Sequence, residues 1–243
     1  MNLIIDVGNT RIKAAVFEND SLIALFVFEE KDLVQHVEKM VSTYSVMSGI
    51  ISSVAAISNT TLKKIKELLP LLELNAATKV PFSNLYKTPK TLGVDRVALV
   101  ARAVEKYPNR NVLIIDAGTC ITYDFVNSTK EYLGGAISLG IQMRYTALHK
   151  GTSKLPLLEL QEVGSFIGNS TESSIHSGVI HGVLNEIEGV IEQYQRKKKD
   201  LTVVLTGGDT NFLAKQLKSV IFANPNFVLE GLNTILTYNK EEC

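Results

Sequence analysis

The chain has 243 residues and a mass of 26.7 kDa, and its 45% hydrophobic and 21% charged residues are typical of a globular protein with its own core. Its 25 basic and 25 acidic residues cancel, so the basic excess that usually accompanies nucleic-acid binding is absent. The two cysteines, Cys120 and Cys243, do not make a disulfide framework, and no Cys/His spacing suits a zinc site.

The beginning of the chain does not resemble a targeting segment. Met1 is followed almost directly by the apolar run 3–5, without the basic segment that opens a signal peptide. The longest apolar stretch, residues 22–28, is far too short to cross a bilayer. We therefore expect a cytoplasmic protein that has neither a membrane nor a nucleic acid as partner.

Strands and helices alternate along the chain. In the first half, apolar runs predict strands over residues 3–5, 12–17, 22–28 and 46–54, and helical spacing predicts helices over 31–44, 62–69 and 95–107. Residues 81–93 include two prolines and several small polar residues, which indicates a loop. In the second half, strands are predicted over 112–115, 121–126, 132–138 and 203–205, and helices over 141–149, 170–195 and 210–217. This pattern predicts an α/β fold.

One six-residue segment occurs twice. Leu-Ile-Ile-Asp-Val-Gly at 3–8 returns as Leu-Ile-Ile-Asp-Ala-Gly at 113–118, and in both copies a second strand follows the Asp-x-Gly turn. Two copies this far apart indicate two related α/β lobes, which we place at residues 1–111 and 112–243. The alternative is that buried strands resemble one another by chance, but the shared Asp and Gly argue against it.

The residue types in the two turns suit phosphate and metal. Glycine lets the backbone approach an anion and point N–H groups at it. A carboxylate there would repel ATP unless a cation lay between them, so Asp6 and Asp116 are interpreted as cation ligands, direct or through water. The turns also carry neutral donors and one positive charge, on Asn9, Thr10, Lys13 and Thr119. The alternative is that each Asp only satisfies its own turn through an Asx hydrogen bond.

Other nucleotide-binding motifs are missing from the sequence. There is no P-loop run and no Gly-x-Gly-x-x-Gly after a strand. A third glycine-rich turn, at residues 206–209, follows the predicted strand 203–205. Beside two phosphate turns, it suits close approach to an adenine or a ribose.

Asp95, within Leu-Gly-Val-Asp-Arg at 92–96, is the candidate for acid–base chemistry. A kinase needs a group that orients the acceptor hydroxyl and takes its proton. Asp95 lies where the predicted loop meets a helix, which is also the place of an N-cap Asp, so both interpretations stay open. The neighbouring Arg96 could clamp a carboxylate bidentately or pair with a nearby acidic residue.

Five short motifs together resemble the type III pantothenate kinase family. They lie at residues 6–10, 93–96, 116–119, 134–137 and 168–171, and their order and spacing match that family over essentially the whole chain. The resemblance implies the duplicated fold of actin-like ATPases and of acetate and sugar kinases, which is ribonuclease H-like, with two related lobes of mixed β-sheet flanked by helices. It also implies a homodimer that uses ATP, Mg²⁺ and K⁺ or NH₄⁺ to phosphorylate pantothenate, the first step of coenzyme A synthesis.

The same resemblance assigns roles to individual residues. Asp95 would accept the proton of pantothenate, Asp6 would lie near magnesium, through water, and Asp116 would ligate the monovalent cation. The residues that would bind ATP are Asp6, Val7, Gly8, Asn9, Thr10, Arg11, Ile12, Lys13 and Thr119. The residues that would line the pantothenate site are Tyr86, Gly93, Val94, Asp95, Arg96 and Thr171, with Arg96 near the substrate carboxylate.

Some positions allow other interpretations or depart from the family pattern. Tyr86 could be a plain surface-loop tyrosine, and Thr171 an ordinary helix N-cap. Leu139-Gly140 stands where the family usually has Pro-Gly, and Cys120 where alanine is more common; these changes concern loop shape. The functional alternatives are another small-alcohol kinase of the superfamily, a non-catalytic nucleotide-binding regulator and, more weakly, an ATP hydrolase.

Overall fold

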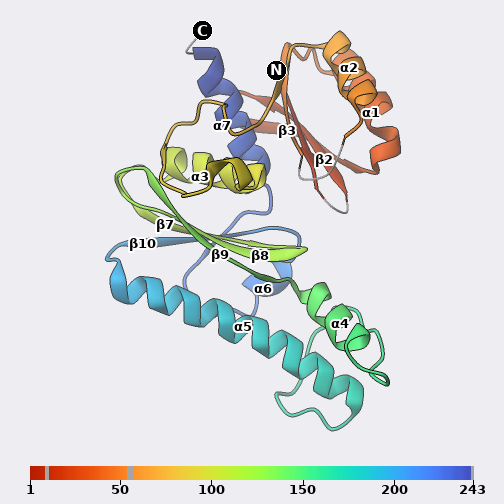
Figure 1. Cartoon of the computed structure of the whole chain (residues 1–243), viewed down its shortest axis with the longest axis vertical. Helices are drawn as coiled ribbons and strands as arrows, with labels where there is room; N and C mark the ends of the chain where they lie inside the picture. Colours follow the sequence, from red (N-terminus) through yellow and green to blue (C-terminus); the bar gives the residue numbers. More distant parts are fainter. Residues whose placement is uncertain (9–10, 54–56, 242–243) are drawn as a thin grey trace. The chain divides into compact units, whose positions relative to one another are not determined.

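The computed structural model describes residues 1–8, 11–53 and 57–241 (Figure 1). The chain forms two compact units: residues 1–109, 128–133 and 226–243 make the first, and residues 110–127 and 134–225 make the second. The predicted boundary after residue 111 lies close to the change of unit after residue 109. Residues 226–243, which we had assigned to the second lobe, group instead with the first unit.

The first unit contains a five-stranded sheet in the order β3-β2-β1-β4-β5. Its strands are β1 (Asn2–Val7), β2 (Ile12–Glu18), β3 (Ser21–Phe28), β4 (Ser48–Ser53) and β5 (Leu71–Glu73). The central strand β1 is antiparallel to β2 and parallel to β4. Because β1 is covered on both faces, it is apolar almost throughout, as a buried strand requires.

Helices cover both faces of this sheet, as Figure 1 shows. After a short 3₁₀ turn, η1 (Glu30–Asp32), helices α1 (Leu33–Thr43) and α2 (Asn59–Leu68) bury Leu33, Val37 and Ile65 against Leu3 and Ile5. On the other face, α7 (Phe227–Glu241) contacts β1 and β4 and packs along α3 (Val94–Lys106). The last helix of the chain therefore completes the first unit.

The second sheet has the order β11-β10-β7-β8-β9-β6. Its strands are β7 (Asn111–Ala117), β8 (Cys120–Val126), β9 (Glu131–Leu139), β10 (Leu201–Thr206), β11 (Phe222–Ala223) and β6 (Ser83–Asn84). The long helix α5 (Thr171–Lys197) packs its isoleucines on one face, against Leu113, Ile115 and Leu205. The remaining elements are α4 (Ile141–Lys150), α6 (Thr210–Ala214) and the 3₁₀ turn η2 (Pro89–Thr91).

The two sheets share one strand topology. The strands β7, β8, β9, β10 and β11 of the second sheet correspond in order to β1, β2, β3, β4 and β5 of the first. With this correspondence, the order β3-β2-β1-β4-β5 of the first sheet becomes β9-β8-β7-β10-β11, which is the second sheet without β6, read from its other end. In both, the repeated segment is a central strand with an antiparallel hairpin partner and a parallel neighbour. The predicted α/β fold with two related lobes of mixed sheet is therefore confirmed.

Most predicted elements are present, and the differences have physical causes. Helix α2 begins three residues earlier than predicted because Ser58 caps it, its side chain accepting a hydrogen bond from the amide of Thr61. The predicted loop 81–93 contains the strand β6 and the turn η2. Helix α6 ends at Ala214 rather than at residue 217. The sequence interpretation did not include the short strands β5 and β11 or the helix α7.

Candidate functional site

The first Asp-x-Gly turn lies at the carboxyl end of β1. In the sheet, Asp6 pairs with Lys13 on β2 and with Ser52 on β4, and the Ser52 hydroxyl donates a hydrogen bond of 2.7 Å to the Asp6 carboxylate. The amide of Gly8 donates to the carbonyl of Arg11 at 3.2 Å, which brings the two strands together at the turn. Val7 and Ile12 pair across the same turn, and their side chains are buried in the core. Asn9 and Thr10 lie outside the described residues.

The electrostatic environment of Asp6 favours a bound cation. Burial raises the pKa of the Asp6 carboxyl and the nearby charge of Asp95 raises it further, while the Ser52 hydrogen bond and the charge of Lys13 lower it; the pKa stays above its ordinary value. A cation at this carboxylate would offset both its desolvation and the repulsion from Asp95. Within residues 1–8, 11–53 and 57–241, no group of three His, Cys, Asp or Glu side chains forms a metal cage. Asp6 could hold magnesium, an ion that takes few protein ligands and keeps several waters.

Asp95 lies in the first turn of α3 and is not its N-cap. The N-cap is Gly93, Val94 is the first helical residue, and the Asp95 carboxylate accepts a hydrogen bond of 2.9 Å from the amide of Arg96. A Cβ added at Gly93 would lie 2.4 Å from an oxygen of Asp95. A side chain at position 93 would therefore displace the carboxylate of Asp95.

Arg96 and Tyr86 lie together. Arg96 is only 5% exposed, and its guanidinium carbon is 5.6 Å from the centre of the Tyr86 ring, within the range of a cation–π contact. Tyr86 is half-buried, so it is not a plain surface tyrosine. The first unit thus holds five of the six residues expected at the pantothenate site; among them Arg96 contacts Tyr86, and Asp95 lies within electrostatic reach of Asp6.

The second Asp-x-Gly turn has the same place in its sheet but a different chemistry. Asp116 pairs with Thr122 on β8 and with Thr206 on β10. Both threonine hydroxyls are buried without a hydrogen-bond partner among the described residues. Residues paired in register share a face of the sheet, so two neutral oxygens flank the carboxylate. This donor set suits a hard monovalent cation.

The third glycine-rich turn packs beside the second. Gly207 has a φ of +98°, and a Cβ there would lie 2.4 Å from a carboxylate oxygen of Asp116. The amide of Asp209 donates to the carbonyl of Ala117 at 2.9 Å. Because glycine adopts a positive φ and leaves room for the carboxylate, the turn 206–209 closes directly on Asp116.

Gly140 of the Leu139-Gly140 pair packs against the second turn. Gly140 caps α4, and a Cβ at this position would lie 2.1 Å from the carbonyl oxygen of Gly118 and 2.2 Å from that of Thr119. Leu139 is exposed, as is Thr119. Of the family's usual Pro-Gly pair, the glycine is therefore the residue that packing requires, and this chain retains it as Gly140.

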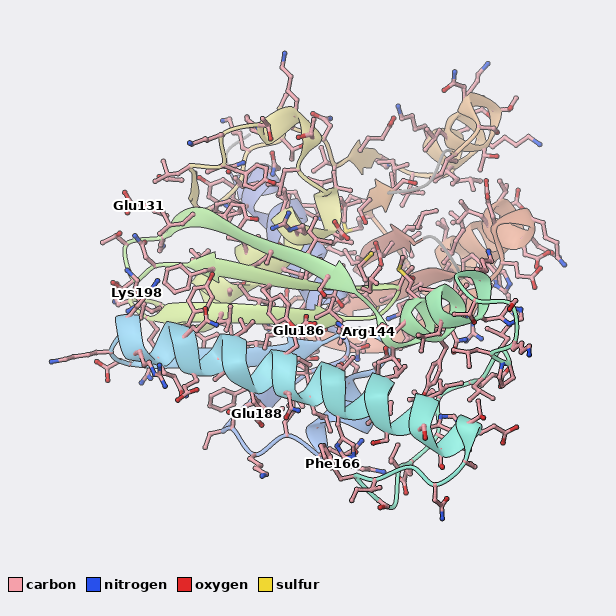
Figure 2. The ribbon with its side chains drawn as sticks, turned by 60° about the horizontal axis from the view of Figure 1, so that its bottom comes forward. Glu131, Arg144, Phe166, Glu186, Glu188 and Lys198 are labelled. Carbon is pink, nitrogen blue, oxygen red and sulfur yellow. The ribbon has the colours of Figure 1, made fainter. Side chains whose placement is uncertain are left out.

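Thr171 begins α5 and lines a cavity of about 1210 Å³ within the second unit. Its helix is capped by Ser170, whose side chain and that of Ser173 form a capping box, so Thr171 is not the N-cap. The wall of the cavity includes Arg144 of α4, which is paired with Glu186 of α5, and Figure 2 shows these two side chains pointing toward each other.

Ser52 and Tyr132 are the residues that the sequence interpretation missed. Ser52 lies two residues before the end of the predicted strand 46–54, and only the parallel register of β1 and β4 places it opposite Asp6. Tyr132 is the first residue of the predicted strand 132–138, and its ring stacks on Tyr86. A local sequence pattern carries no signal for either contact.

Comparisons with known proteins show the family of the chain. The family model described as type III pantothenate kinase matches residues 2–193. A type III pantothenate kinase of Christiangramia forsetii is 49% identical over 243 residues, covering 100% of both chains, and one of Bacteroides fragilis is 43% identical over 241 residues, covering 99% of each.

Solved structures show the fold. A Baf family protein from Campylobacter jejuni superposes with a TM-score of 0.64 at 20% identity, covering 98% of this chain and 99% of the other. A glucokinase from an Antarctic psychrotroph superposes with a TM-score of 0.52 at 12% identity, covering 98% of each chain. Among the helices in the described ranges, none has the length and apolar character of a membrane span. The fold is that of the actin-like sugar kinases, and the chain belongs to the type III pantothenate kinase family.

Proposed function

We propose that the chain transfers the γ-phosphate of ATP to the hydroxyl of pantothenate, giving 4′-phosphopantothenate in coenzyme A synthesis. One observation carries the proposal: the first unit holds the carboxylates of Asp6 and Asp95 within electrostatic reach of each other, with Arg96 following Asp95 at the start of α3. Phosphorylation of a hydroxy acid requires a cation for the phosphates, a group that accepts the hydroxyl proton and a positive charge for the acid group. The carboxylate of Asp6 can bind the cation, that of Asp95 can bind the hydroxyl, and the buried guanidinium of Arg96 can bind the acid group.

The glycine turns bind and orient ATP. The segment from Asp6 to Lys13 would bind the phosphates, and Lys13, which pairs with Asp6 in the sheet, adds a positive charge. Asp6 would hold magnesium through water, and when bound this ion neutralises charge on the phosphates. Asp116, flanked by the hydroxyls of Thr122 and Thr206, would hold potassium or ammonium, while Thr119 contacts the nucleotide.

Asp95 orients the hydroxyl of pantothenate and accepts its proton. A general base of this kind contributes roughly 10²–10⁴-fold to a rate. The hydrogen bond from the Arg96 amide fixes one carboxylate oxygen, so the other can face the substrate. The guanidinium of Arg96 binds the pantothenate carboxylate, and Tyr86, Gly93 and Val94 line the same site. Thr171, at the start of α5, is a further residue that the family resemblance assigns to pantothenate. On the strength of the family, we propose a cytoplasmic homodimer.

The decisive experiment measures ADP release with and without pantothenate, in potassium and then in sodium buffer, and after chelation of magnesium. We expect turnover only with pantothenate, with magnesium and in potassium. Turnover independent of pantothenate would indicate an ATP hydrolase, and no turnover in potassium would indicate a nucleotide-binding regulator.

The role of Asp95 is tested by Asp95→Asn, which should abolish turnover and leave ATP binding largely intact. Asp20→Asn, at an exposed position, is the matched control and should keep the wild-type rate. An unchanged rate for Asp95→Asn would remove Asp95 as the base.

A further inference from the structure

A row of aromatic rings in the first unit ends at the guanidinium of Arg96. The ring of Phe82 meets that of Tyr132 edge-on at 6.2 Å, and Tyr132 stacks on Tyr86 at 6.0 Å with 19° between the ring planes. The far end of the row is Arg96, 5.6 Å from the centre of the Tyr86 ring. The row therefore runs from the hydrophobic core to a charged group of the proposed substrate site.

Tyr132 is the fixed member of this row. Its side chain is 0% exposed, whereas Tyr86 is half-buried in the segment between β6 and η2. The carbonyl of Tyr132 accepts a hydrogen bond of 3.0 Å from the amide of Leu85, and β6 pairs in parallel with Glu131 and Tyr132. Both the backbone and the ring of Tyr132 thus hold the segment that carries Tyr86.

The stacking restricts the groups that would otherwise be mobile. Tyr86 lies outside regular secondary structure, and an arginine side chain loses considerable rotamer freedom when it is ordered. The Tyr86 ring contacts both Tyr132 and Arg96, so its order restricts the guanidinium. A guanidinium that is ordered before binding binds a carboxylate with less loss of entropy. The rings of Tyr132 and Tyr86 are nearly parallel, with 19° between their planes, and this geometry allows Tyr86 to contact Tyr132 and Arg96 at the same time.

We propose that Tyr132 is a positioning residue for the pantothenate site: it does not contact the substrate, but it orders Tyr86 and, through Tyr86, the guanidinium of Arg96. This inference rests on the proposed function, because it assumes that Arg96 binds the substrate carboxylate. It predicts a role in pantothenate binding that is separate from ATP binding and from the chemical step.

The test compares Tyr132→Leu and Tyr132→Phe in steady-state kinetics. For Tyr132→Leu we expect the KM for pantothenate to rise about tenfold, the size expected for losing one aromatic stack and weakening one cation–π contact. The KM for ATP and kcat at saturating pantothenate should stay close to wild type. Tyr132→Phe keeps the ring and should restore a KM near that of the wild type.

A matched control separates positioning from general destabilisation. Phe227 is also buried, and its ring lies 6.0 Å from Nζ of Lys106 in the last turn of α3, whereas Arg96 is in the first turn of that helix. Phe227→Leu should lower the melting temperature as Tyr132→Leu does, with the KM for pantothenate unchanged. If Tyr132→Leu also leaves that KM unchanged, Tyr132 only fills the core and the inference is wrong.

Two further variants keep the outcome decisive. If Tyr132→Leu does not fold, Tyr132→Met fills most of the same volume without a π face; a raised KM supports the inference and a wild-type KM overturns it. Arg96→Lys tests the assumption beneath it. If Arg96→Lys leaves the KM for pantothenate unchanged, the assigned substrate site is wrong. If Arg96→Lys raises this KM and the Tyr132 variants leave it unchanged, only the positioning role of Tyr132 is wrong.

Discussion

Asp6 and Asp116 hold equivalent positions in the two sheets, but their neighbours differ in chemistry. Each pairs with a hydroxyl residue on the parallel neighbouring strand, Ser52 for Asp6 and Thr206 for Asp116. On the antiparallel side Asp6 has Lys13, while the partner of Asp116 is a threonine. A positive charge beside the first carboxylate suits phosphates, and neutral oxygens beside the second suit a monovalent cation.

At the residue scale, Gly93 gives the most direct test of how the site is packed. In Gly93→Ala the new Cβ would lie 2.4 Å from an oxygen of Asp95, so the carboxylate must move. A displacement of about 1 Å can cost roughly 10²-fold in rate, and we expect kcat to fall by that order while ATP binding, measured by calorimetry, persists. Gly164→Ala, where an added Cβ meets no atom within 4 Å, should keep the wild-type kcat. Equal rates for both variants would show that Asp95 tolerates displacement.

At the scale of elements, the crossing of α3 and α7 depends on one glycine. A Cβ at Gly231 of α7 would lie 1.9 Å from the carbonyl oxygen of Ala98 in α3, so the two helices approach backbone to backbone. This close contact lets α7 cover the sheet while α3 keeps Asp95 and Arg96 at its first turn. The position of the site is thus tied to the packing of two helices far apart in the sequence.

We expect Gly231→Ala to lower the free energy of unfolding by about 1–3 kcal/mol, the usual cost of overpacking. Gly189, inside α5, is the matched position because an added Cβ there meets no atom within 4 Å. Gly189→Ala should raise stability by roughly 0.5–1 kcal/mol through helix propensity. Urea denaturation measures both; a stabilising Gly231→Ala would contradict the close crossing.

A polar network joins α4, α5 and β8 in the second unit. Arg144 of α4 pairs with Glu186 of α5, and the hydroxyl of Tyr123 donates to the same carboxylate at 2.8 Å (Figure 2). Burial alone would raise the pKa of Glu186, but the hydrogen bonds from Arg144, Tyr123 and Ser138 and the charge of Arg144 outweigh it and hold this pKa below its ordinary value.

The lowered pKa makes this network sensitive to acid. The contribution of the network to the free energy of unfolding is present above the ordinary pKa of a glutamate. It is lost as the pH falls through the lower pKa that Glu186 has in the folded state. Between about pH 5 and pH 3, the free energy of unfolding should therefore fall more steeply in the wild type than in Glu186→Gln. Glu192→Gln, which alters an exposed pair with Arg196 on the same helix, should follow the wild-type curve. Parallel curves for wild type and Glu186→Gln would contradict the network.

At the scale of the molecule, the first unit is built from both ends of the chain. Helix α7 buries Phe227, Leu229, Leu232 and Ile235, and it contacts β1, β4 and α3. The second unit lies almost entirely between these ends in the sequence. Folding of the unit that carries Asp6 and Asp95 therefore depends on α7, which follows the second unit in the sequence.

Removal of α7 tests this dependence. In a chain truncated after Pro225, we expect amides of β1, β4 and α3 to lose protection from hydrogen exchange, because one face of their sheet loses its cover. Amides of β7, β10 and α5 should stay protected, since their core is formed within the second unit. A chain truncated after Glu241 retains α7 and serves as the control. Protected β1 amides in the shorter chain would show that α7 is dispensable.

The sequence by itself determined the duplicated α/β organisation, the family and the residue types of both turns. These properties are local: the period of apolar residues, the Asp-x-Gly spacing and the order of short motifs can be read along the chain. The roles of Asp6, Asp95 and Asp116 as ATP, substrate and cation residues stay predictions.

Only the tertiary structure decided which residues support those motifs. Ser52 reaches Asp6 across 46 positions of sequence, Tyr132 stacks on Tyr86, Gly207 closes on Asp116, and α7 belongs to the first unit. The physical reason is that such contacts follow from strand register and from close approach of backbones. A one-residue change in register would turn Ser52 to the opposite face, and no local pattern encodes which strands become neighbours.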